Sequence, residues 1–110
     1  MENFIFQKTL DEQGRIAGIE ISGLLVLENS QELKKEFLGV IDCLNNQVKI
    51  SVSNVSDIDL SFVQLLMAFI KQMNIAHLAY QFEWNLDEDQ KTLFENVGLS
   101  NELNLNNLYA

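Results

Sequence analysis

Alternating apolar and polar residues predict four strands, because successive side chains on a strand point to opposite faces of a sheet. The four segments are residues 3–10, 15–23, 48–55 and 77–84. The turn-like stretch DEQG at 11–14 separates the first two segments. These two strands are therefore predicted to form a hairpin.

Apolar residues spaced three and four positions apart predict three helices between and after these strands. They lie within residues 28–46, at about 60–74 and within 87–99. The apolar face of the first helix consists of Leu33, Phe37, Ile41 and Leu44. The inner face of the third helix consists of Leu93, Phe94 and Val97. Gly98 provides this helix with a left-handed C-cap.

The predicted order β-β-α-β-α-β-α is that of an α/β domain. Strands joined by crossover helices run parallel, whereas a hairpin is antiparallel. We therefore expect a mixed sheet of four to five strands with about three to four helices packed on it. A chain of 110 residues has room for one compact domain, so residues 1–110 are predicted to form a single unit.

The second predicted helix carries more apolar surface than packing on a sheet requires. Its apolar arc covers about 220°, whereas a surface helix needs roughly 100°. One flank consists of Leu60, Val63, Met67 and Ile70, and the other of Phe62, Leu65, Leu66, Phe69 and Met73. Either the second flank packs on a neighbouring helix, or part of its Phe62–Leu65–Phe69 side stays open as a contact surface for another protein.

The start of this helix combines acidic residues with a serine. Asp59 is the predicted N-cap, Asp57 lies in the preceding loop and Ser61 lies in the first turn. A phosphate on Ser61 would meet free backbone N–H groups and the positive end of the helix dipole. The two aspartates would repel the same phosphate. Ser61 is therefore either a phosphorylation switch or an ordinary residue of a first helical turn.

Net charge restricts the partners of this chain. Sixteen acidic and seven basic residues give a formal charge of −9, which repels phosphate backbones and anionic lipid surfaces. We therefore expect no binding to nucleic acid. We also expect no membrane insertion, because no run of about 18 apolar residues is present. The first ten residues, MENFIFQKTL, lack the features of a signal peptide, and the expected location is the cytoplasm.

Motifs for cofactors or catalysis are missing from the sequence. It contains no phosphate-binding glycine loop, no HExxH motif and no paired cysteines. His77, the single histidine, is expected to be structural or on the surface, and Cys43 to be a small buried hydrophobe. We expect no cofactor, no metal and no enzymatic activity.

Three stretches in this order, ISGLLVLENSQEL, VKISVSNVSDIDLSFVQLLMAFIKQM and LFENVGLSNEL, resemble the STAS domain family, which includes bacterial anti-anti-sigma factors. The matching motifs are Gly23-Leu24-Leu25, Asp59-Leu60-Ser61-Phe62 and Gly98-Leu99. The resemblance covers roughly residues 15–103. It implies a STAS-like fold and binding to a protein partner.

In the anti-anti-sigma members that this chain resembles, the serine at the Ser61 position is phosphorylated by a kinase-like anti-sigma factor, which breaks their complex. The resemblance implies the same role for Ser61. The predicted partner-binding residues are Asp57, Asp59, Ser61, Phe62, Gln64 and Leu65. Val26, Ser51 and Phe62 stand where those members carry aspartate, aspartate and glycine. The stretch DLSFVQLL is closer to a branch found in lipid-transport ABC complexes and near chemotaxis genes.

Three functions follow from this resemblance. The first is a non-enzymatic signalling domain, an anti-sigma factor antagonist switched at Ser61. The second is a constitutive regulatory subunit that binds an ABC-type lipid-transport ATPase, or that associates with itself as a homodimer. The third is a STAS domain that binds a nucleotide or another small ligand, although no basic phosphate clamp stands near the start of the second helix.

Overall fold

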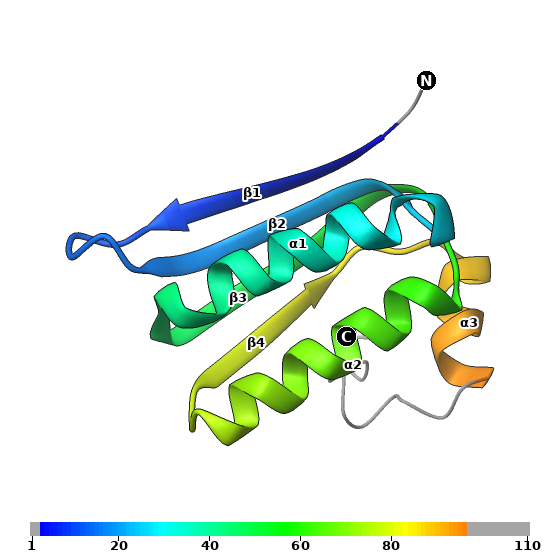
Figure 1. Cartoon of the computed structure of the whole chain (residues 1–110). Coiled ribbons are helices and arrows are strands. Elements are labelled where there is room, and N and C mark those ends of the chain that lie inside the picture. Colours follow the sequence, from blue (N-terminus) through cyan, green and yellow to red (C-terminus); the bar gives the residue numbers. More distant parts are fainter. Residues whose placement is uncertain (1–2, 97–110) are drawn as a thin grey trace.

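The computed structural model describes residues 3–96, with side chains up to residue 93, and its elements follow the predicted order (Figure 1). The strands are β1 (Phe4–Leu10), β2 (Ile16–Leu25), β3 (Leu44–Ile58) and β4 (Ala79–Trp84). The helices are α1 (Ser30–Val40), α2 (Leu60–Ile75) and α3 (Glu88–Asn96). Two short 3-10 helices, η1 (Leu27–Asn29) and η2 (Ile41–Cys43), flank α1.

The four described strands form one mixed sheet in the order β1-β2-β3-β4. β1 pairs antiparallel with β2, whereas the pairs β2–β3 and β3–β4 are parallel. This arrangement confirms the predicted hairpin and the predicted crossovers. Helices α1 and α2 lie on the same face of the sheet (Figure 1).

Strand alternation divides the sheet into a covered face and an exposed face. On β3, Val48, Ile50 and Val52 are buried, whereas Lys49 between them is exposed. Lys49 forms an ion pair with Glu83 of β4, with 2.6 Å between Nζ and Oε2. The side chains of both residues are more than half exposed, so this pair contributes at most about 1 kcal/mol.

The core lies between the covered face of the sheet and the two helices α1 and α2. Phe37 of α1 is at its centre, with its ring centroid 4.7 Å from Phe69 and 6.4 Å from Phe62, both of α2. Phe6 of β1 meets the same ring edge-on at 5.3 Å. The second apolar flank of α2 therefore packs on the neighbouring helix, as the first of our two interpretations predicts.

Three local expectations are wrong. Leu44 is the first residue of β3 rather than part of the apolar face of the first helix, because α1 ends at Val40. Strand β4 begins at Ala79 rather than at residue 77, because His77 adopts a left-handed conformation with φ of 58° and turns the chain after α2. Cys43 is exposed rather than buried, because Val40 and Leu44 on either side occupy the inward positions.

Some expectations concern the end of the chain. The side chain of Phe94, together with Val97, Gly98 and Leu99, lies outside the described residues. Within residues 3–96, no helix has the length and hydropathy that crossing a bilayer requires.

Candidate functional site

The predicted site lies at one end of the sheet, where β2 and β3 finish and α2 begins (right-hand side of Figure 1). Asp59 is the residue between β3 and α2. Its backbone N–H donates to the carbonyl of Leu25 at 3.2 Å, and its Oδ2 accepts from the backbone N–H of Leu27 at 2.9 Å. Asp59 therefore connects the start of α2 to the end of β2 and to η1.

The other carboxylate oxygen of Asp59 caps α2. Oδ1 accepts from the backbone N–H of Ser61 at 3.0 Å and also from the Ser61 hydroxyl. The extended backbone of Asp59, with φ of −135°, is typical of an N-cap. The predicted cap is confirmed, and its side chain also fixes the direction of the Ser61 hydroxyl.

These hydrogen bonds lower the pKa of Asp59. Partial burial raises the pKa, but the hydrogen bonds from the Ser61 side chain and from the backbone N–H groups of Leu27, Ser61 and Phe62 outweigh burial. The net result is a pKa below the ordinary value of 3.8. Asp59 is therefore ionised at neutral pH and stays available as an acceptor.

Asp59→Asn is expected to lower the free energy of unfolding by about 1 kcal/mol at neutral pH, because the amide nitrogen that replaces one carboxylate oxygen cannot accept, so the N–H of either Leu27 or Ser61 loses its acceptor. Since the folded pKa of Asp59 is lowered, its ionised form stabilises the fold above pH 3.8. This contribution disappears as pH falls from there through the folded pKa. The difference between wild type and variant, measured by urea unfolding, should therefore shrink as pH falls below 3.8.

Asp57→Asn is the matched control for this prediction. Asp57 is exposed, and among the described residues its Oδ1 accepts a local bond, from the N–H of Ile58 at 2.8 Å. Its replacement should change the free energy of unfolding by less than about 0.5 kcal/mol. Equal losses for the two variants would contradict a special role of Asp59 in the fold.

The structure corrects the prediction for Phe62. Its side chain has 0% exposure, and it packs inward against Phe37. Phe69, on the same flank of α2, is 4% exposed. Phe62 therefore cannot serve as an exposed anchor for a partner, because the helix turns its ring into the core.

Two leucines that sequence reasoning missed provide the exposed apolar surface at this end of the sheet. Leu27 is 65% exposed and Leu60 is 46% exposed. Leu27 is held by its hydrogen bond to Asp59, and Leu60 directly follows Asp59 in the chain. Their positions in the chain could have predicted this exposure. Leu27 lies between a strand and a helix, and Leu60 is the first residue of α2. Neither side chain is therefore covered by a neighbouring helical turn.

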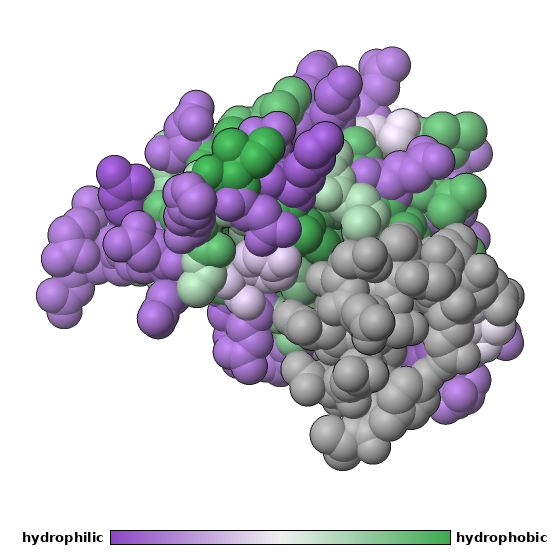
Figure 2. Space-filling view, turned by 90° about the horizontal axis from the view of Figure 1, so that it is seen from below, coloured by the Kyte–Doolittle hydropathy of each residue, from purple (hydrophilic) through white to green (hydrophobic). Residues whose placement is uncertain are grey.

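The other predicted residues lie around this centre with different exposure. Ser61 is half-buried, whereas Asp57 and Gln64 are exposed. Leu65 is half-buried and faces α1, where it lines an apolar groove of about 240 Å³ between the two helices. Figure 2 shows hydrophobic patches between hydrophilic side chains on the face seen from below. Five of the six predicted residues thus keep at least partial access to solvent.

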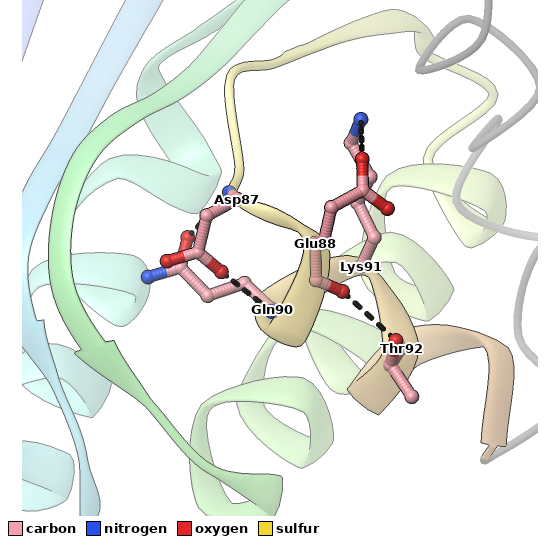
Figure 3. Close-up of polar contacts among 5 residues, drawn as sticks. All are labelled: Asp87, Glu88, Gln90, Lys91 and Thr92. Carbon is pink, nitrogen blue, oxygen red and sulfur yellow. Dashed lines mark hydrogen bonds and ion pairs between the residues drawn. The ribbon is translucent and has the colours of Figure 1, made fainter.

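Helix α3 brings further acidic residues to this end of the sheet. Asp87 and Gln90 cap its start reciprocally, through bonds of 2.8 Å and 3.1 Å between each side chain and the other residue's backbone N–H (Figure 3). Gln90 Nε2 also donates to the carbonyl of Val55 at 3.0 Å, which ties α3 to β3. The exposed carboxylate of Asp87 therefore adds negative charge near the end of β3, whereas that of Glu88 forms an ion pair with Lys91 at 3.6 Å.

Among residues 3–96, no group of three or more His, Cys, Asp or Glu side chains is placed to hold a metal ion. The Ser61 hydroxyl donates to a carboxylate rather than to a histidine. This end of the sheet offers a hydroxyl, ionised acids and exposed leucines, a combination suited to binding another protein.

No protein-family model matches this sequence, and no curated protein sequence matches it. Among solved structures, the Bacillus cell fate determinant SpoIIAA in the phosphorylated form is similar, with a TM-score of 0.60 at 16% sequence identity. The similarity covers 88% of this chain and 86% of that chain. SpoIIAA has a STAS-like fold. The chain therefore has the STAS-like α/β fold that the sequence motifs predict.

Proposed function

We propose that residues 1–110 act as one non-enzymatic STAS-like domain that binds a protein partner through the start of α2, with Ser61 as a phosphorylation switch. The observation that carries this proposal is the position of the Ser61 hydroxyl. It is half-buried, bonded to ionised Asp59 and located beside the exposed leucines Leu27 and Leu60. The likeness to the phosphorylated form of SpoIIAA supports the same interpretation at the level of fold.

Phosphorylation would change this arrangement through charge. The hydroxyl proton that bonds to Asp59 would be replaced by a group carrying about −1.5 to −2 charges, next to a carboxylate. The two anions would repel each other, and the new charge would also face the partner across an apolar contact. A complex formed through Leu27 and Leu60 would therefore dissociate when Ser61 is phosphorylated.

The partner is expected to be a kinase-like anti-sigma protein or an ABC-type ATPase with a basic, partly apolar surface. Basic residues would complement the exposed carboxylates of Asp57 and Asp87, and apolar ones would cover Leu27 and Leu60. We propose that this encounter takes place in the cytoplasm.

Titration calorimetry with a candidate partner, a kinase-like anti-sigma protein or an ABC-type ATPase, tests the binding surface. Ser61→Glu and Leu60→Asp should each weaken binding at least about tenfold, because they place a charge in the contact. Ser61→Ala should leave affinity within about threefold, since Asp59 keeps its backbone donors. Ile75→Asp is the matched control, because Ile75 is similarly exposed at 62% but lies at the other end of α2. Equal weakening by Ile75→Asp, or none by Leu60→Asp, would refute this surface.

A second candidate function is a constitutive subunit of an ABC-type ATPase, without a switch. Phe62 favours it, because the anti-anti-sigma members that the chain resembles carry glycine at this position. The existing bond between the Ser61 hydroxyl and Asp59 also favours it, because a kinase must break that bond. Intact-mass analysis of chain from its own cells separates the two candidates. A phosphoryl group assigned to Ser61 supports the switch, and a stable complex that never carries one supports the constitutive subunit.

A further inference from the structure

We propose that two copies of this chain associate through the free edge of β1, as a symmetric antiparallel pair that joins their sheets. β1 is the outermost strand and pairs with β2 alone among the described strands. Figure 1 shows no element beyond it on that side. This inference does not depend on the proposed role of Ser61, which lies in a different part of the fold.

The edge of β1 lacks most of the features that prevent strand edges from pairing. Soluble proteins protect such edges with proline, charged residues, bulges or a covering element. This chain contains no proline, and Lys8 is the one charged residue of β1. Pairing with β2 is regular from Phe4 to Thr9, with a shift only after Thr9. The edge is therefore straight enough to accept another strand.

Apolar exposure on β1 also favours association. Ile5 is 53% exposed and Leu10 is 59% exposed, so two of its seven residues present large apolar side chains to water. Phe4 and Phe6 are half-buried and lie on the face that α1 and α2 cover. A second strand alongside β1 would cover the remaining apolar surface of these residues.

Charge points to β1 rather than to the opposite edge of the sheet. Two chains with a formal charge of −9 repel each other, and this electrostatic repulsion is weakest between surfaces that carry no carboxylates. β1 contains no acidic residue and carries Lys8, whereas the edge strand β4 contains Glu83. Pairing β1 of one copy with β4 of another would also leave free edges at both ends and would not close.

A two-fold axis at Gln7 gives a self-complementary register. Phe4 of one copy then lies opposite Leu10 of the other, Ile5 opposite Thr9, and Phe6 opposite Lys8. Two apolar Phe4–Leu10 pairs form by symmetry, and no two like charges lie directly opposite each other. Because a single seven-residue strand provides the contact, the interface is small, and its dissociation constant should be micromolar.

Sedimentation velocity of the full chain over about 5 to 500 µM tests this pairing. Wild type should shift from monomer to dimer across the range. The double variant Ile5→Glu with Thr9→Glu places like charges opposite each other and should weaken the dimer at least about tenfold. The double variant Ile5→Lys with Thr9→Glu places opposite charges there and should restore it. Both positions are exposed in the monomer, so the fold should survive, as circular dichroism can verify.

The control is Leu38→Glu on α1, which removes an equally exposed leucine (61%) away from β1 and should leave the dimer unchanged. A chain that stays monomeric up to the highest concentration overturns the proposal. So does a dimer that survives Ile5→Glu with Thr9→Glu. If the double variant Ile5→Lys with Thr9→Glu does not restore the dimer, the antiparallel register is wrong.

Discussion

Phe62→Ala is expected to lower the free energy of unfolding by about 3–5 kcal/mol, because it removes a fully buried aromatic ring. The ring lies among Phe37, 6.4 Å away between centroids, and the rest of the core, so its removal leaves a cavity that helices α1 and α2 can only partly close. Urea unfolding followed by circular dichroism gives the loss directly.

Leu60→Ala provides the contrast two residues away on the same helix. Leu60 is 46% exposed, so its truncation should change the free energy of unfolding by no more than about 0.5 to 1 kcal/mol. Similar losses for the two variants would contradict the orientation of the first turn of α2. Phe62→Asp is expected to unfold the protein, and loss of partner binding in that variant would therefore say nothing about the interface.

Gly23→Ala is expected to cost about 2–4 kcal/mol, for two reasons that add. Gly23 has φ of +96°, which residues with a side chain rarely adopt. An added Cβ would lie 2.4 Å from the carbonyl oxygen of Asn3 and 2.9 Å from the Cα of Phe4, and both are backbone atoms. The start of β1 must therefore move away from β2, with loss of the bond from the Leu24 N–H to the Asn3 carbonyl.

Substitutions at two other glycines distinguish the cost of the positive φ from the cost of the steric clash. Gly14 has φ of +81° but open space around its Cα, so Gly14→Ala should show the conformational cost alone, about 1 kcal/mol. Gly39 lies in α1 with open space, and Gly39→Ala should stabilise the fold by about 0.5–1 kcal/mol. Hydrogen exchange of the β1 amides should accelerate in Gly23→Ala and not in Gly14→Ala. An equal cost at Gly23 and Gly14 would show that the close approach of Asn3 is unimportant.

The fold was largely predictable because periodicity and connection length carry most of its information. Alternation at Val48, Ile50 and Val52 located the centre of β3, and the turn at 11–14 determined the antiparallel pairing of β1 with β2. Ends of elements were less predictable. β3 continues to Ile58, past a left-handed residue at Asn54, because pairing with β2 supports positions whose own sequence is polar.

At the candidate site, the placement of the polar residues was predictable and the exposure of the apolar residues was not. The Asp59 cap follows from a local rule that relates one side chain to the next two residues. The exposure of Phe62 and Leu60 depends instead on how α2 rotates against α1, which the broad apolar arc of the helix left undetermined. The hydrogen bond from the Leu27 N–H to Asp59 joins residues 32 positions apart, so no local sequence pattern predicts it.

The inward ring of Phe62 has a consequence for recognition. The buried ring of Phe62 and the hydrogen bonds of Asp59 both hold the first turn of α2. The surface beside Ser61 is therefore already ordered before a partner binds. In the proposed complex, docking would cost this chain little conformational entropy, so differences in affinity between competing partners would arise mainly from how much each partner must rearrange.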